Sequence, residues 1–226
     1  MLHIGILAAL VSASAVGQER GKDLERGTDL GREQILDRIA VIVGTQVITE
    51  SQVITDLRVE AFIDQKPVDL SGKAKLEAAG RLVDQMLMLQ EADTSHLALP
   101  TLEAAQELVN RLRADYPMPG SFQAALDRYK ITEHDVAVHM LIGLQTLTFT
   151  ELRFRPGIQI SDADLQKAYE ELVPADQRTQ PGGSLEDNRR QLEDLLINRR
   201  VIQSLDEWLA DARTDLSIRY RRPVFR

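Results

Sequence analysis

The amino-acid sequence predicts a mainly helical domain with one small β-hairpin that a C-terminal strand joins. Three observations predict this fold class. Short β-branched runs flank a Gly-Thr pair at residues 44 and 45, apolar residues then recur with a helical period over most of the chain, and an alternating run follows the last helix. With 226 residues, of which 43% are hydrophobic, the chain can bury a sizeable core.

The first 36 residues are expected to lie outside this domain. Residues 4–16 form an apolar run that is too short to span a bilayer, and two small-x-small sites lie between residues 13 and 17. From these features we interpret residues 1–17 as a signal peptide. The start contains only His3 and neither Lys nor Arg, so a buried first helix or an uncleaved anchor is the alternative. Residues 18–36 are charged and contain several glycines, which predicts a flexible leader.

The hairpin is expected from Arg38–Val43 and Val47–Thr49. Both runs are rich in β-branched residues, and Gly44-Thr45 offers a tight turn between them. The run Leu216–Arg221 alternates apolar and polar residues, which is typical of a half-buried strand. Because an isolated hairpin is barely stable in water, we expect this last strand to pair with it and to bring the two ends of the domain together.

A helical period begins at Thr49 and continues to residue 214. Several helix starts carry a side chain that can accept a hydrogen bond from a first-turn N–H group, three residues before an acid or amide. These pairs are Thr49 with Gln52, Thr132 with Asp135, Ser161 with Asp164, and Ser184 with Asp187. The predicted helices cover residues 50–65, 71–94, 101–115, 120–129, 133–154, 162–172 and 185–214. Proline or glycine interrupts the pattern between them at Pro67, Pro100, 117–120 and Pro156.

The last predicted helix, residues 185–214, has an apolar stripe along one face. The stripe consists of Leu192, Leu195, Leu196, Ile202, Leu205, Leu209 and Ala212. Charged residues occupy the rest of the helix, so the stripe is expected to pack against the body of the domain. The segment before it, Val173–Gly183, is rich in Pro, Gly, Gln and charge and has no apolar period, and we interpret it as an exposed linker.

Four stretches carry the pattern of a known family in the same order. They are Asp37–Thr49, Val83–Ala92 with its Asp-Gln pair and Gln-Glu-Ala ending, Phe122–Thr132, and Ile160–Glu171. Together they resemble the N-terminal domain of SurA-type periplasmic chaperones, over residues 37–222. The resemblance implies a multi-helix peptide-binding fold, similar to the C-terminal domain of trigger factor, that holds unfolded polypeptides.

The resemblance also implies that a catalytic insert is missing. In the SurA family one or two parvulin-type proline-isomerase domains normally follow the helix equivalent to Ser161–Leu172. Only Val173–Gly183 occupies that place here, far fewer than the roughly 50 residues that a domain needs. Pro181-Gly182-Gly183 has neither a strand pattern nor a histidine pair around it, so we interpret it as part of the linker.

Residues suited to catalysis or metal binding are few. The chain has no cysteine, which excludes disulfides and a thiolate nucleophile. His134 and His139 lie five residues apart on one predicted helix, so their side chains are expected to diverge, and His96 is expected to cap a helix end. Asp162 and Asp164 begin a predicted helix, where negative charge is stabilising without any chemistry. We therefore expect no catalytic residue, no metal site and no cofactor.

Charge argues against a nucleic-acid partner. The net charge is −8, and basic residues are mixed with acidic ones along most of the chain. The one basic cluster, Arg219, Arg221, Arg222 and Arg226, is interpreted as a solvated tail. No segment after the signal peptide has the length and apolarity of a membrane span, so stable membrane insertion is not expected either.

The remaining candidate feature is an apolar surface for polypeptides. Apolar residues fall on several faces of Val136–Phe149, so this helix either is buried in the core or lines a groove. The candidate peptide-binding residues are Met86, Met88, Met118, Phe122, Tyr129, Met140, Leu144, Leu147 and Phe149. Flexible thioether side chains suit promiscuous binding.

The predicted function is a periplasmic holdase, a chaperone that binds unfolded exported proteins, such as outer-membrane proteins, without catalysis. Two alternatives stay open: a dedicated subunit of one envelope-assembly partner, and a reduced proline isomerase. A homo-oligomer is compatible with either kind of binding protein.

Overall fold

The structure is a computed structural model that describes residues 37–178, 180 and 182–226. The compact unit spans Asp37–Arg226. Within its described residues, seven α-helices and one small antiparallel sheet make the domain mainly helical, as predicted. The signal peptide and the leader expected over residues 1–36 lie outside the described residues.

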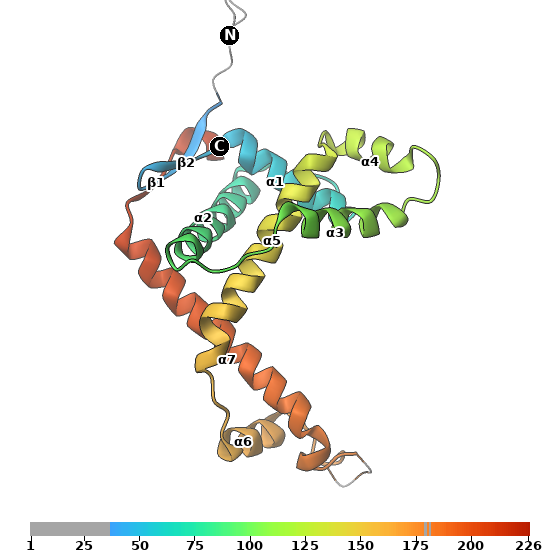
Figure 1. The fold of residues 1–226 in the computed structure, drawn as a ribbon, viewed down its shortest axis with the longest axis vertical. Helices are drawn as coiled ribbons and strands as arrows, with labels where there is room; N and C mark the ends of the chain where they lie inside the picture. Colours follow the sequence, from blue (N-terminus) through green and yellow to red (C-terminus); the bar gives the residue numbers. More distant parts are fainter. Residues whose placement is uncertain (1–36, 179, 181) are drawn as a thin grey trace, which may run out of the picture. The chain divides into compact units, whose positions relative to one another are not determined.

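A three-stranded sheet joins the two ends of the domain (Figure 1). β1 (Ile39–Val43) and β2 (Gln46–Thr49) form the hairpin, and β3 (Ile218–Tyr220) pairs antiparallel with β1 to give the order β2-β1-β3. Gly44 has a φ of +57°, a left-handed value that favours glycine in the tight turn. The predicted return of the last strand to the hairpin is confirmed.

The helices begin and end within two residues of the predicted positions. They are α1 (Glu50–Ile63), α2 (Gly72–Thr94), α3 (Leu102–Ala114), α4 (Ser121–Tyr129), α5 (Glu133–Phe154), α6 (Asp162–Leu172) and α7 (Leu185–Asp215). All four expected pairs form reciprocal capping boxes, at the starts of α1, α5, α6 and α7. His96 lies just beyond α2, where its Nδ1 is 2.9 Å from the Asp93 carbonyl oxygen, in line with its expected capping role. None of the described helices has the length and apolarity needed to cross a membrane.

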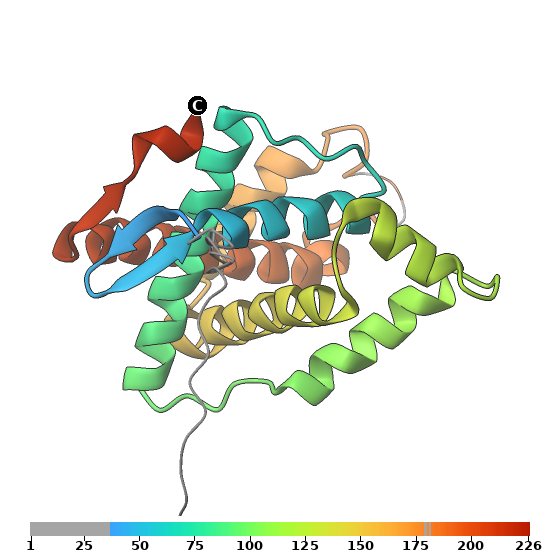
Figure 2. The ribbon, with the colours of Figure 1, turned by 90° about the horizontal axis from the view of Figure 1, so that it is seen from above.

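Two large core clusters fix the body of the domain. The first lies under the sheet, where Val41 of β1 and Val53 of α1 pack with Val83 of α2. The second joins α1 to α3, α4 and α5 around Phe62, whose ring contacts the rings of Tyr116, Phe122 and Tyr129. α3 and α4 therefore lie on the side of α1 and α5 away from the sheet (Figures 1 and 2).

The C-terminal segment is not the solvated tail that its arginines suggested. Residues Arg222–Phe225 form a short 3-10 helix, η2, in which Val224 is 3% exposed and belongs to the core under the sheet. The Arg221 N–H donates to the Ala40 carbonyl oxygen over 2.8 Å. The four arginine side chains are exposed, which is why their charge suggested a solvated tail. The backbone between them packs against the domain, so the packed domain extends past residue 222.

Most described residues of the segment between α6 and α7 are exposed, as predicted for a linker, but several contacts hold the segment against α6. Among its described residues Gly183 is buried, and the Tyr169 hydroxyl of α6 donates to the Gly183 carbonyl oxygen over 2.6 Å. Arg178 Nε donates to the Val173 carbonyl oxygen over 2.7 Å, and its guanidinium lies 5.4 Å from the centre of the Tyr169 ring. These contacts hold the connecting segment against α6, so α6 and α7 form a helical hairpin with an anchored connection.

Candidate functional site

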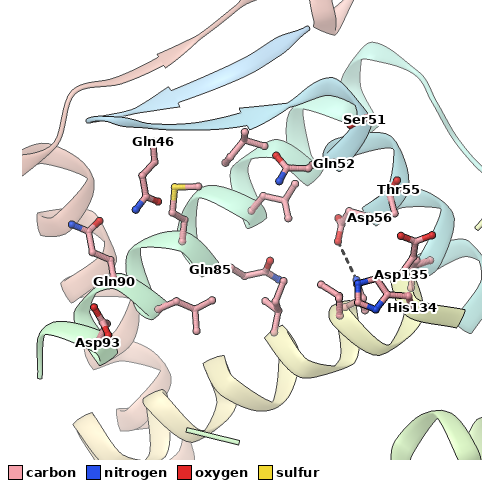
Figure 3. Close-up of a pocket in the computed structure, with 18 residues that line it drawn as sticks. Gln46, Ser51, Gln52, Thr55, Asp56, Gln85, Gln90, Asp93, His134 and Asp135 are labelled. Carbon is pink, nitrogen blue, oxygen red and sulfur yellow. Dashed lines mark hydrogen bonds and ion pairs between the residues drawn. The ribbon is translucent and has the colours of Figure 1, made fainter. Parts of the chain in front are cut away.

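A groove of about 760 Å³ lies between α1, α2 and α5 and is bordered by β2. Figure 3 shows its polar side chains pointing into the space between the three helices. This volume lies within the range of sites that bind organic ligands, roughly 300–1,000 Å³. The groove is therefore the strongest candidate binding site in the described part of the chain.

Each helix contributes one face to the groove. The lining residues of α2 are Leu82, Gln85, Met86, Leu89, Gln90 and Asp93. Those of α1 are Ser51, Gln52, Thr55, Asp56 and Val59. Those of α5 are His134, Asp135, Val138, His139 and Ile142. Spacings of three and four place such residues on one side of a helix. The opposite side of α2 carries Val83 and Leu87 into the core.

The apolar part of the lining comes from all four elements. It consists of Ile48, Val59, Leu82, Met86, Leu89, Val138 and Ile142. Of these, Leu89, Val138 and Ile142 belong to none of the core clusters and are half-buried. Their remaining apolar area is thus available to a ligand rather than committed to folding.

Glutamine amides form much of the polar part of the lining. Gln46, Gln52, Gln85 and Gln90 all face the groove (Figure 3). Gln52 uses its Oε1 to accept from the Thr49 N–H over 2.8 Å in the capping box of α1. The side chains of Gln46, Gln85 and Gln90 make no hydrogen bond to any described residue, so their donors and acceptors are available to a ligand.

A buried carboxylate connects the three walls of the groove. Asp56 of α1, with its side chain 7% exposed, lies with Oδ1 3.1 Å from His139 Nδ1 of α5 and with Oδ2 3.1 Å from Arg81 Nη2 of α2. Arg81 also pairs with Glu60, at 2.5 Å. Burial raises the pKa of Glu60, and the nearby charge of Asp56 raises it further. Two partners thus compensate the charge that α1 buries at the groove wall.

The contact with Asp56 sets the role of His139. A carboxylate accepts hydrogen bonds, so Nδ1 of His139 is the donor in this contact. His134 lines the same groove as His139. In the described part of the chain no group of three or more His, Cys, Asp or Glu side chains is arranged to hold a metal ion.

Of the candidate residues named from the sequence, Met86 alone lines the groove. Met88, Phe122 and Phe149 are buried in core clusters, with the Phe149 ring 5.3 Å from the ring of Trp208. These three side chains stabilise the fold and present little surface to a ligand. Apolar residues at helical spacing are equally typical of a buried core and of a groove. The sequence therefore did not show which of these two roles each residue has.

The other candidates lie outside the groove as well. Tyr129 and Met140 pack at the edge of the Phe62 cluster, and Leu144 is half-buried on α5. Met118, 73% exposed, lies before α4, and Leu147, 60% exposed, lies on α5. The Val136–Phe149 helix therefore combines both alternatives that the sequence left open, since it buries one side and lines the groove with Val138 and Ile142.

Comparison with known proteins finds no family model and no curated protein that matches this chain. The likeness to SurA-type chaperones thus rests on the sequence stretches alone. Any functional argument must start from the groove.

Proposed function

We propose that the protein binds extended, apolar segments of unfolded polypeptides in the groove between α1, α2 and α5, and releases them without catalysis. The observation that carries the proposal is a lining that combines apolar area outside the core clusters with side-chain amides that have no described partner. The SurA-like stretches and the expected signal peptide extend the proposal to a holdase for exported proteins in the periplasm.

The dimensions of the groove suit a short extended segment. Its lining on α2 runs from Leu82 to Asp93, a distance of about 17 Å along a helix that rises 1.5 Å per residue. An extended chain rises about 3.3 Å per residue, so roughly five residues fit beside α2. A longer client would pass through the open groove rather than end in it.

The chemistry of the lining suits recognition of the main chain. A glutamine amide offers both an acceptor and two donors, which match the N–H and C=O groups that an extended peptide leaves unpaired. Gln46, Gln85 and Gln90 can make such bonds to any sequence, while Met86 adapts to different side chains. Such a surface favours many clients over one.

Aggregation of an unfolded outer-membrane protein tests the proposal. We expect the chain without residues 1–17 to slow aggregation at an equimolar ratio, and the double substitution Leu89→Gln with Ile142→Gln to weaken this effect. Both side chains are already half-buried in the free protein, so a client covers only part of their apolar area. A combined loss of about 1.4 kcal/mol corresponds to about tenfold more protein for the same protection. Both side chains lie outside the core clusters, so the variant should stay folded, and its urea midpoint is measured beside the aggregation assay.

Leu147→Gln with Ile202→Gln is the matched control. These two side chains are 60% and 58% exposed and lie outside the groove, so the control should protect the client as well as the unchanged protein does. Failure of the unchanged protein to slow aggregation would refute the holdase. Pull-down of one partner instead of many would favour a dedicated subunit, and acceleration in a protease-coupled proline-peptide assay would favour an isomerase.

A further inference from the structure

The groove lining has an unbalanced set of charges. It contains the carboxylates of Asp56, Asp93 and Asp135, and no Lys or Arg among the described residues that line it. A carboxylate that has no partner in the protein can attract a cationic side chain of a ligand, whereas a compensated carboxylate attracts it less. The preference of the groove for a charged ligand therefore depends on which of the three carboxylates has no partner in the protein.

Two of these carboxylates are compensated by the protein itself. Asp56 lies between Arg81 and His139. Asp135 accepts from the N–H and the hydroxyl of Thr132, each over 2.7 Å, at the start of α5, where the helix dipole is positive. Both lie toward the same end of the groove (Figure 3).

Asp93 differs from both in its surroundings. It is exposed in the last turn of α2, where the helix dipole is negative, and its carboxylate has no hydrogen bond or ion pair with any described residue. In Figure 3 it lies with Gln90 and Gln46 at the end of the groove opposite Asp56 and Asp135. Asp93 is thus the lining carboxylate that has no compensating partner among the described residues.

We propose that the groove selects extended segments that carry a Lys or Arg beside an apolar run, with the basic side chain at the Gln46–Gln90–Asp93 end, and discriminates against segments with Asp or Glu there. This inference rests on the proposed function, since it specifies which polypeptides the same groove takes. The amides of Gln46 and Gln90 can accept from the ammonium or guanidinium group beside Asp93. The overall charge of −8 disfavours an acidic segment further.

Three labelled peptides of equal length and apolar content test the selection, with Lys, Gln or Glu at the two ends of the apolar run. Fluorescence anisotropy with the full chain measures their dissociation constants. The expected order of affinity is Lys, then Gln, then Glu, with about a two- to fivefold step, as for exposed charge pairs. In about 1 M salt, where the Debye length is near 3 Å, the three values should converge.

Substitution of Asp93 identifies the source of the selection. Asp93→Asn should remove most of the difference between the peptides, and Asp93→Lys should reverse the order while the Gln peptide binds as before. A lysine in the last turn of α2 suits the helix dipole, so the fold should tolerate it. Asp194→Asn and Asp194→Lys are matched controls, because Asp194 of α7 is also exposed, has no partner among the described residues and lies outside the groove.

The outcomes separate this inference from the proposed function. Equal binding of the three peptides would refute the selection and leave the groove as a binding site. An unchanged order in Asp93→Lys, or a reversed order in Asp194→Lys, would refute its assignment to Asp93. Absence of binding by any peptide would refute the proposed function together with the inference.

Discussion

At the residue scale, Asp56 is the side chain that connects all three walls of the groove. It comes from α1, and its two partners come from α2 and α5. A buried carboxylate is tolerated because both partners donate to it. The shape of the groove and the stability of the domain therefore depend on the same carboxylate.

Asp56→Asn should lower the free energy of unfolding. The amide keeps the shape but loses the charge, and it cannot accept with both of its terminal atoms, so one of the two contacts is lost at a cost of about 1–2 kcal/mol. Urea denaturation measures the change, and Asp194→Asn is the control, with no expected effect. An Asp56→Asn variant as stable as the unchanged protein would show that the three walls are held by apolar packing alone.

Residues of the site were harder to predict than residues of the core. The apolar periods predicted α1, α2 and α5 as helices, and their residues Val53, Val83 and Val136 are buried. The same periods do not reveal that Gln85 and His139 face one shared space, because that depends on how three helices pack. A polar residue on the solvent face and a polar residue in a groove have the same sequence pattern.

At the element scale, a close backbone approach fixes the C-terminal 3-10 helix. A Cβ atom at Gly72, the first residue of α2, would collide with the backbone carbonyl group of Phe225. The conformation of Gly72 is ordinary, so glycine is required there for space. The docking of η2 and the start of α2 therefore depend on each other.

Gly72→Ala should displace η2 and expose Val224. The expected loss of stability is about 1–3 kcal/mol, the usual cost of an atom that does not fit. Urea denaturation and carboxypeptidase digestion of the C-terminus measure the two effects. Gly80→Ala, in the middle of the same helix with open space around its Cβ position, should instead stabilise the protein by about 0.5–1 kcal/mol. A reversed sign in either variant would contradict the packing described.

Elements with local signals were predicted closely, and two segments that are held by contacts with other elements were not. The capping boxes gave the starts of α1, α5, α6 and α7 because two residues three positions apart form each box. The docking of η2 depends on Gly72, far away in the sequence, and the order between α6 and α7 depends on Tyr169. Composition alone predicted a solvated tail at the C-terminus and an exposed linker between α6 and α7.

At the scale of the whole domain, the sequence predicted the closure of the sheet and left a groove beside α5 as one of two alternatives, without its position. The pairing of β3 with β1 followed from a hairpin that needs a third strand and from the alternating run near the end of the chain. The groove arises where α1 packs with α2 in the core under the sheet and with α5 in the core around Phe62, while other faces of the three helices line a common space. Its position could be found only when the packing of these helices was known.

Site-specific crosslinking tests the central claim most directly. A photoreactive amino acid placed at Gln85, in the middle of the groove lining, should crosslink to an unfolded outer-membrane protein, whereas the same group at Gln191, exposed on α7, should not. An extended apolar peptide in excess should compete with the crosslink at Gln85. Equal crosslinking at both positions, or crosslinking at Gln191 alone, would contradict binding in the groove.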